Sequence, residues 1–308
     1  MSFSTDIKNE ITRTESTNLE NAALLSAYIR QTAYIDDTVV RIHTENVSIC
    51  RYLFKVIKNL YDVTSKIAVK KSFNFKKTNT YMLEIRDKKD FILRDLSLIN
   101  EEGYFINVPK EYIIDDDELR KAYLSGCFLA SGSINNPKTS RYHLEFLVDD
   151  SEYASFISNM LNEYRLNSRI IKRKNGYMIY IKEADKISDF LRMIKAYNGV
   201  LYFENVRIYR DQKNITNRLN NCEQANVEKT INAALRQIED INVIADKIGL
   251  DTIDEKISEV ASFRLKYPES SLLELSTIMS HETGKTITKS CLNHRFRKIR
   301  ELAEKIKQ

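Results

Sequence analysis

Glycine and proline are scarce in this sequence, with seven and three residues among 308. Both residue types interrupt helices and strands, so their scarcity predicts mostly regular secondary structure with short connections. No stretch approaches the eighteen consecutive apolar residues of a membrane-spanning helix, and the N-terminus, MSFSTDIKNEIT, lacks the apolar core of a secretion signal. We therefore expect a cytoplasmic protein with no membrane partner.

Cysteine pairs at metal-ligand or redox spacing are also absent. No CxxC motif occurs, and the cysteines and histidines do not group into a four-ligand zinc pattern. The GxSxG, P-loop, HExxH and GxGxxG patterns of common enzymes are missing as well. We interpret the four cysteines as reduced, mostly buried thiols and expect no cofactor and no metal site. The cysteines are Cys50, Cys127, Cys222 and Cys291.

Length and charge leave the class of partner open. A chain of 308 residues predicts two or three domains with enough residues for a full core. The formal charge of +5 is small for this length, so only clustering of the cations can indicate a polyanionic partner.

Clustering of that kind occurs near the C-terminus. Apolar residues recur at helical spacing along one side of the segment, at Leu292, Phe296, Ile299, Ala303 and Ile306. From Gly284 to Arg300 there are six Lys or Arg and no Asp or Glu. Asn and Arg at the exposed start of such a helix have the donor geometry to reach adenine and guanine edges in a major groove. A solvated charged face is the alternative interpretation. The candidate DNA-binding residues here are Lys289, Ser290, Asn293, His294, Arg297 and Arg300.

The preceding segment predicts the rest of a helix-turn-helix. Ile257 and Val260 mark an amphipathic helix that Pro268 ends, and Ser271 with Glu274 forms a capping-box pair at the start of a second, short helix. Gly284 separates this short helix from the basic one. Two helices, a turn and a basic helix within about sixty residues are typical of a DNA-reading module. Arg295 falls on the apolar side of the basic helix, where we expect it to extend its charged end to solvent.

The first two hundred residues contain one unit twice. Tyr81-Met82 recurs as Tyr177-Met178, 96 residues later, and the flanking segments correspond. Each copy predicts the order helix, two strands, helix, two strands, helix. In the second copy we expect helices at 117–131 and 152–164, an extended segment at 141–148, and a hairpin at 169–181 around Asn175-Gly176. The fold class is therefore α+β, with a duplicated αββαββα unit of pseudo-twofold symmetry.

Small residues four apart predict how the two copies meet. Ala23 and Ala27 lie on the first helix of one copy, and Gly126 and Ala130 on that of the other. Such strips let two helix backbones approach closely.

Each copy also carries an acid-free basic hairpin. Together the two hairpins would form a cationic concave surface suited to the phosphates of a duplex. Lysines that protect an exposed sheet edge are the alternative. The cations are Lys66, Lys70, Lys71, Lys76 and Lys77 in the first copy, and Arg165, Arg169, Lys172, Arg173, Lys174 and Lys182 in the second; our candidate DNA contacts among them are Lys70, Lys71, Lys172, Arg173 and Lys174.

Several motifs carry a resemblance to a known family. AYLSGCFLASGSI (122–134) resembles the LAGLIDADG helix of homing endonucleases, and LLSAYIRQTAYI (24–35) resembles a degenerate partner helix. With SLLELSTIM and KSCLNHRFRKI near the C-terminus, nearly the whole chain resembles the WhiA family of bacterial transcription regulators. Thr288 and Cys291 depart from the Ser and Gly expected beside Lys289-Ser290. The resemblance implies a LAGLIDADG-like part, a C-terminal helix-turn-helix, and a role in sporulation or cell division of Gram-positive bacteria.

A nuclease of the LAGLIDADG type needs one carboxylate from each motif helix to hold divalent metals. Aligning the motif places Thr32 and Ser131 at those positions, and neither supplies an anionic ligand. Asp36 and Asp37 follow the first motif, but Asn135 and Asn136 follow the second. We expect a nuclease scaffold that is not an enzyme.

Three functions stay open at this point: a sequence-specific DNA-binding regulator, an endonuclease, and an RNA-binding or splicing-helper protein. The helix-turn-helix favours the first, because the major groove of A-form RNA is too deep and narrow for side chains to read. The expected partner is double-stranded DNA, in the nucleoid, with other transcription factors or RNA polymerase as further candidates. The expected domains are residues 1–203, with repeats at 1–113 and 114–203, and a helix-turn-helix domain at 251–308. A helical linker at 204–250 joins them. This linker either docks on the first domain or tethers the two domains.

Overall fold

The computed structural model describes residues 2–71, 79–139 and 141–307, and the chain divides into two compact units, Met1–Arg210 and Asp211–Gln308. Helix α8, Tyr197–Lys247, contains the boundary between them. Val200 and Phe203, near its start, are buried in the core of the first unit. Ile241 and Ile244, near its end, are buried in the core of the second. The predicted helical linker at 204–250 is thus largely part of one helix, α8, which contributes to both cores.

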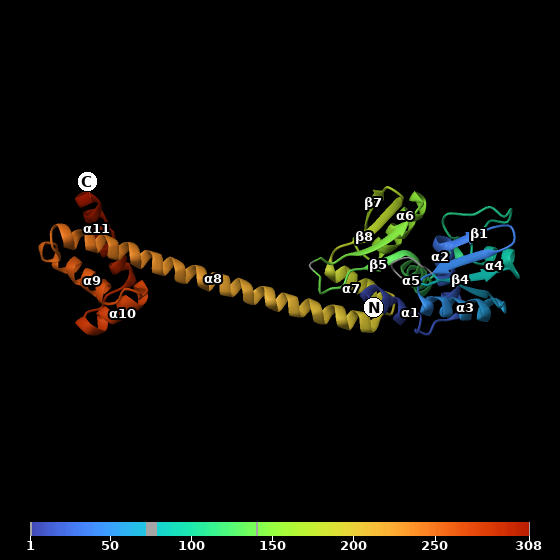
Figure 1. Ribbon diagram of the computed structural model, residues 1–308, viewed down its shortest axis with the longest axis horizontal. Coiled ribbons are helices and arrows are strands. Elements are labelled where there is room, and N and C mark those ends of the chain that lie inside the picture. Colours follow the sequence, from blue (N-terminus) through green and yellow to red (C-terminus); the bar gives the residue numbers. More distant parts are fainter. Residues whose placement is uncertain (1, 72–78, 140, 308) are drawn as a thin grey trace. The chain divides into compact units, whose positions relative to one another are not determined.

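The first unit contains the predicted order of elements twice (Figure 1). Helix α1, Phe3–Ile11, precedes the first repeat. The first repeat consists of α2 (Asn18–Thr32), β1 (Ala33–Ile35), β2 (Val40–Thr44), α3 (Val47–Tyr61), β3 (Lys66–Lys71), β4 (Asn79–Ile85) and α4 (Lys89–Asp95). After a 3-10 helix at Glu111–Ile113, the second repeat consists of α5 (Asp117–Ser131), β5 (Gly132–Ile134), β6 (Leu144–Val148), α6 (Ser151–Glu163), β7 (Arg169–Arg173), β8 (Gly176–Ile181) and α7 (Ala184–Met193). The duplicated αββαββα fold is confirmed.

Each repeat forms one antiparallel four-stranded sheet, with strand order β1-β2-β4-β3 in the first and β5-β6-β8-β7 in the second. Their registers correspond. Tyr81 pairs with Thr44, the last residue of β2, and Tyr177 pairs with Val148, the last residue of β6. The spacing of 96 residues that the sequence indicates is therefore the spacing between equivalent positions of β4 and β8.

Two local predictions in the second repeat need correction. Strand β6 begins at Leu144 rather than Arg141, because Tyr142 packs against Phe203 of α8, with ring centroids 5.4 Å apart. The hairpin turn consists of Lys174 and Asn175, since Arg173 pairs directly with Gly176. Gly176 has φ +102°, and a Cβ there would overlap the carbonyl oxygen of Val148, so the first residue of β8 has to be glycine.

Helices α2 and α5 lie side by side and join the two repeats (Figure 1). Gly126 of α5 sits against the backbone of Leu24, and a Cβ on Gly126 would lie 2.8 Å from the Cβ of Ala27. Ala23 and Ala27 are 1% and 0% exposed. The close approach that the small-residue strips predict is confirmed, and it places the C-terminal ends of the two motif helices next to each other.

The second unit is helical. After the 3-10 helix Leu250–Thr252 come α9 (Glu255–Lys266), α10 (Leu272–Thr283) and α11 (Lys289–Lys307), which pack with the end of α8 around one apolar core. The predicted capping box of Ser271 and Glu274 is present, and Gly284 ends α10 in the left-handed conformation with φ +66°. On α11, Leu292, Phe296, Ile299 and Ala303 are buried as predicted.

Candidate nucleic-acid interface

The apolar stripe of α11 faces the core, which turns the opposite side of the helix to solvent. That side comprises Lys289, Ser290, Asn293, His294, Arg297 and Arg300, all exposed, and is called the α11 face below. Arg300 donates to Glu304 at 2.9 Å. Within the described part of the chain, Asn293, His294 and Arg297 make no hydrogen bond or ion pair. Their donors are therefore free to bind another molecule.

Thr288 and Ser280 hold the start of α11. The hydroxyl of Thr288 accepts from the backbone N–H of Cys291 at 3.2 Å and so satisfies one of the free donors at the helix start. Ser280 of α10 accepts from the backbone N–H of Ile287 at 2.9 Å. Thr288 is thus an effective cap despite its departure from the family pattern.

Contrary to the prediction from the sequence, Arg295 does not simply extend its charged end to solvent. Its guanidinium lies 3.7 Å from the carboxylate of Glu259 and donates to the carbonyl oxygen of Lys256 at 3.3 Å. Both partners belong to α9, so Arg295 joins α11 to α9. Contacts between residues this far apart in sequence leave no periodic signal.

Strand alternation divides the predicted basic residues of the second hairpin between two faces. Tyr177 and Ile179 of β8 pack toward the core, so the residues paired with them, including Lys172, lie on the helix side of the sheet. Arg169 pairs with Tyr180, and Arg173 donates to the sulfur of Met178, on the opposite face. We call this opposite side the open face. Lys174 lies in the turn, and all five residues of β7 are exposed.

The first sheet repeats this arrangement at equivalent positions. Lys66 pairs with Glu84 as Arg169 pairs with Tyr180, and Lys70 pairs with Thr80 as Arg173 pairs with Gly176. Each β4 partner lies 96 residues before its β8 counterpart, so two cations occur at matching places on both open faces. Lys71 ends β3, but its side chain, like Lys76 and Lys77, lies outside the described residues.

Acidic residues on the open faces are paired. Glu84 lies 3.0 Å from Arg86 and 3.5 Å from Arg41, and the hydrogen bond from Arg86, followed by the one from Arg41, lowers the pKa of that carboxyl. Glu145 lies 3.0 Å from the Nε2 of His143. Among the described residues, neither acid forms an ion pair with a cation of the edge strands β3 and β7.

The positions that carry carboxylates in a LAGLIDADG nuclease are the last residues of α2 and α5, Thr32 and Ser131. The hydroxyl of Thr32 donates to the carbonyl oxygen of Tyr28 at 2.8 Å, and that of Ser131 donates to the side chain of Gln31. Neutral hydroxyls already engaged inside the protein do not fit a divalent cation. Across the described residues, no cluster of three or more His, Cys, Asp or Glu is arranged to hold a metal ion.

The carboxylate of Asp36 accepts hydrogen bonds within a turn. Its Oδ1 accepts from the backbone N–H groups of Thr38 and Val39, both at 2.9 Å, and its Oδ2 lies 2.8 Å from Arg41. These hydrogen bonds, led by that of Thr38, lower the pKa of Asp36 to about 2. The carboxylate therefore stabilises the β1–β2 connection.

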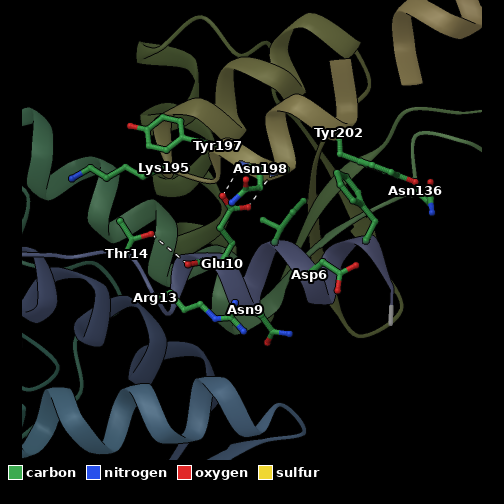
Figure 2. A pocket seen from close by; sticks show the side chains of 13 residues that line it. Asp6, Asn9, Glu10, Arg13, Thr14, Asn136, Lys195, Tyr197, Asn198 and Tyr202 are labelled. Atoms are coloured by element: carbon green, nitrogen blue, oxygen red, sulfur yellow. Dashed lines mark hydrogen bonds between the residues drawn. The ribbon is translucent and has the colours of Figure 1, made fainter. Parts of the chain in front are cut away.

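A cavity of about 800 Å³, between α1 and the start of α8, was not anticipated from the sequence. Figure 2 shows Glu10 pointing at the first turn of α8, where its carboxylate accepts from the backbone N–H groups of Asn198 at 2.7 Å and Gly199 at 3.0 Å. This carboxylate caps α8 from a distant helix. Glu10, one of the charged residues of the cavity wall, thus stabilises the start of α8.

In the described part of the chain, no helix has the length and apolar character that a membrane span requires.

Comparison with known proteins agrees with the two-part architecture. Residues 18–99 match the WhiA N-terminal LAGLIDADG-like domain, residues 120–213 the WhiA LAGLIDADG-like domain, and residues 216–303 the WhiA C-terminal HTH domain. Proteins named "Probable cell division protein WhiA" from Staphylococcus saprophyticus and Staphylococcus carnosus are each 42% identical over 311 residues, covering 100% of this chain and 98% of theirs. The chain belongs to the WhiA family.

Solved WhiA structures have the same fold. Full-length DUF199/WhiA from Thermatoga maritima matches with a TM-score of 0.61 at 24% identity, covering 99% of both chains. The N-terminal LAGLIDADG domain of DUF199/WhiA matches with a TM-score of 0.50 at 24% identity, covering 63% of this chain and 90% of that domain. The resemblance inferred from the motifs is confirmed.

Proposed function

We propose that this WhiA-family chain is a sequence-specific DNA-binding transcription regulator. The observation that carries the proposal is the α11 face: an exposed, acid-free start of a helix whose opposite side is locked into a helix-turn-helix core. Asn293 and Arg297 are one helical turn apart and have unengaged donors, which suits bidentate contacts to adenine and guanine. Lys289 and Arg300 flank them and would meet backbone phosphates.

The open faces would add affinity that does not depend on sequence. Lys66, Lys70, Arg169 and Arg173 recur at equivalent positions of the two sheets, which matches the approximate twofold symmetry of a duplex backbone. Lys174 in the turn extends this cationic edge, whereas Lys172 points to the helix side and would contribute less.

The proposed role is regulation without catalysis, acting on double-stranded DNA in the cytoplasm at the nucleoid. The names of the Staphylococcus relatives include cell division, and we extend that role to this chain, with sporulation as the related process. Other transcription factors or RNA polymerase are further proposed partners. The family and the helix-turn-helix support these proposals.

The test is selection of bound sequences from a random duplex library by the full-length protein, followed by affinity measurements on the selected and a scrambled duplex. Asn293→Ala and Arg297→Ala should each lose ~1–3 kcal/mol of discrimination between the two duplexes. Lys305→Ala is the matched control, because it removes one exposed charge from the last turn of the same helix. Discrimination retained in both α11-face variants, or equal binding of matched RNA, would refute the assignment.

A further inference from the structure

The middle of α8 carries a long run of exposed residues. Every residue from 211 to 229 is exposed, including Ile215 at 59% and Leu219 at 60%. Helical segments without tertiary contacts are marginally stable in water, and most helices are stabilised by packing of one apolar face. A partner that covered the exposed apolar residues of this stretch would therefore stabilise the helix.

Part of the stretch has the spacing of a coiled-coil seam. Ile215, Leu219, Cys222 and Asn226 follow one another at steps of four, three and four, which places them on one side of the helix. Ile215 and Cys222 take d positions, and Leu219 and Asn226 take a positions. An Asn at an a position is a known device for fixing register and strand number in coiled coils, at some cost in stability. Cys222 is an exposed free thiol.

The charges beside the seam favour one orientation. Arg218 takes a g position and Glu223, five residues later, the following e position. Within the described part of the chain neither makes an ion pair or hydrogen bond. In a parallel, in-register pair, the g residue of one helix meets the e residue five positions later in its partner, so Arg218 would meet Glu223 twice. In an antiparallel pair, g positions face g positions and e positions face e positions, so Arg218 would not meet Glu223.

We propose that this seam binds a second copy of the same chain, as a parallel, in-register pair of α8 helices centred on Leu219 and Cys222. The proposal does not depend on DNA binding. Four core layers, one of them polar, make a short interface, so the dimer should be weak in dilute solution and become populated as protein concentration rises.

Cross-linking tests the register in the full-length protein. In a Cys291→Ser background, a short bismaleimide should join two chains through Cys222, and equally through Ile215→Cys when Cys222 is replaced by Ser. The matched control is Asn220→Cys with Cys222→Ser, which places the thiol at a b position, away from the seam, and should give little dimer. Equal yields from the control, or cross-linking at 222 without cross-linking at 215, would overturn the parallel seam.

Exchanging the charges of Arg218 and Glu223 tests the parallel orientation of the two helices. It also distinguishes a loss of dimerisation from a loss of helical structure. Arg218→Glu and Glu223→Arg should each lower the dimer fraction measured by sedimentation equilibrium. A mixture of the two variants should form heterodimers, because each brings the charge that the other lacks. A sedimenting mass that stays monomeric across the concentration range, or a mixture no more dimeric than its components, would show that the seam does not bind a second copy.

Discussion

Arg264 shows how one side chain can connect the helices of the second unit. It is 1% exposed, and its guanidinium donates to the Oε1 of Gln237 at 3.0 Å and to the carbonyl oxygens of Tyr267 and Ser270 at 3.3 and 2.6 Å. It also lies 5.4 Å from the ring centroid of Phe296 on α11. This residue therefore connects the end of α8, the α9–α10 turn and α11.

We expect Arg264→Met to destabilise the second unit by about 1–3 kcal/mol, because methionine fills much of the space but leaves buried carbonyl oxygens without a donor. Hydrogen exchange of the α9–α11 amides in the full-length protein measures the loss. Arg295→Met is the control, since Arg295 is only half-buried and its ion pair should contribute at most ~1 kcal/mol. Equal protection in the two variants would contradict the organising role of Arg264.

Lys8 of α1 is a second residue whose surroundings change its chemistry, in this case its pKa. Its ammonium donates to the carbonyl oxygen of Leu129 at 3.1 Å and lies 5.6 Å from the ring centroid of Phe128. Burial lowers the pKa of Lys8 from its ordinary value of 10.5 to about 8. The unfolded chain therefore holds this proton more tightly between those values, and stability should rise as the pH increases from about 8 toward 10.5.

Replacing Lys8 by Met should remove that pH dependence. Relative to the parent, Lys8→Met should be more favourable at pH 7 than at pH 10, with a difference of up to ~3 kcal/mol in the free energy of unfolding. Urea titrations at both pH values measure it. Lys55→Met, at an exposed position of α3, serves as the control and should show no such difference. A pH-independent effect of Lys8→Met would mean that the ammonium is well solvated in the folded protein.

Among the elements, strand β7 separates residues that look alike in sequence. Arg169 and Arg173 share the open face, while Lys172, one residue away, lies on the helix side. The sequence RIIKR has apolar residues at both parities, so its alternation alone does not say which side is buried. Packing of Ile179 against the helices decides it.

This separation predicts an unequal effect on DNA binding. Arg169→Gln and Arg173→Gln should weaken binding to all duplexes alike and flatten the salt dependence by ~0.9 in slope for each lost phosphate contact. Lys172→Gln removes the same charge from the same strand and should leave the slope nearly unchanged. The measurement is affinity against salt concentration for specific and scrambled duplexes. A slope that changes equally for Lys172 and Arg173 would mean that only net charge matters.

At the scale of the whole molecule, the fold keeps the helix pair of a nuclease while its metal-ligand positions carry hydroxyls. Packing through Gly126 and Ala27 does not involve Thr32 or Ser131, so the scaffold can persist without catalysis. We expect the purified protein not to nick supercoiled plasmid with Mg²⁺ or Mn²⁺, because two neutral side chains supply too little charge for the metals. Asp36→Asn with Asp37→Asn is the control. Nicking that persists through purification and disappears in that double variant would make the chain an endonuclease.

The core of the second unit determines where a fragment that contains the helix-turn-helix can begin. Ile241 and Ile244 of α8 are fully buried among α9, α10 and α11. A fragment that starts at residue 251 lacks both side chains, whereas one that starts at 211 retains the whole core of the second unit.

Much of this architecture follows from the sequence alone, because its signals are local. The period of Leu292, Phe296 and Ile299, the capping pair of Ser271 and Glu274, and the repeat of Tyr81-Met82 each depend on residues within one element or one copy. Helical period determines which side of α11 is buried, and so which side is free to meet DNA.

Tertiary structure decided the rest, because those features depend on contacts between residues far apart in the chain. Glu10 caps α8 across 188 residues, and Lys8 meets Leu129 across 121. No sequence pattern distinguishes Arg264 from the other cations of the chain. Its burial and its hydrogen bonds arise only because the helices of the second unit pack around it. The equivalence of Lys66 with Arg169 likewise required the register of two sheets, since hydrogen bonding between strands aligns positions that the sequence spaces differently.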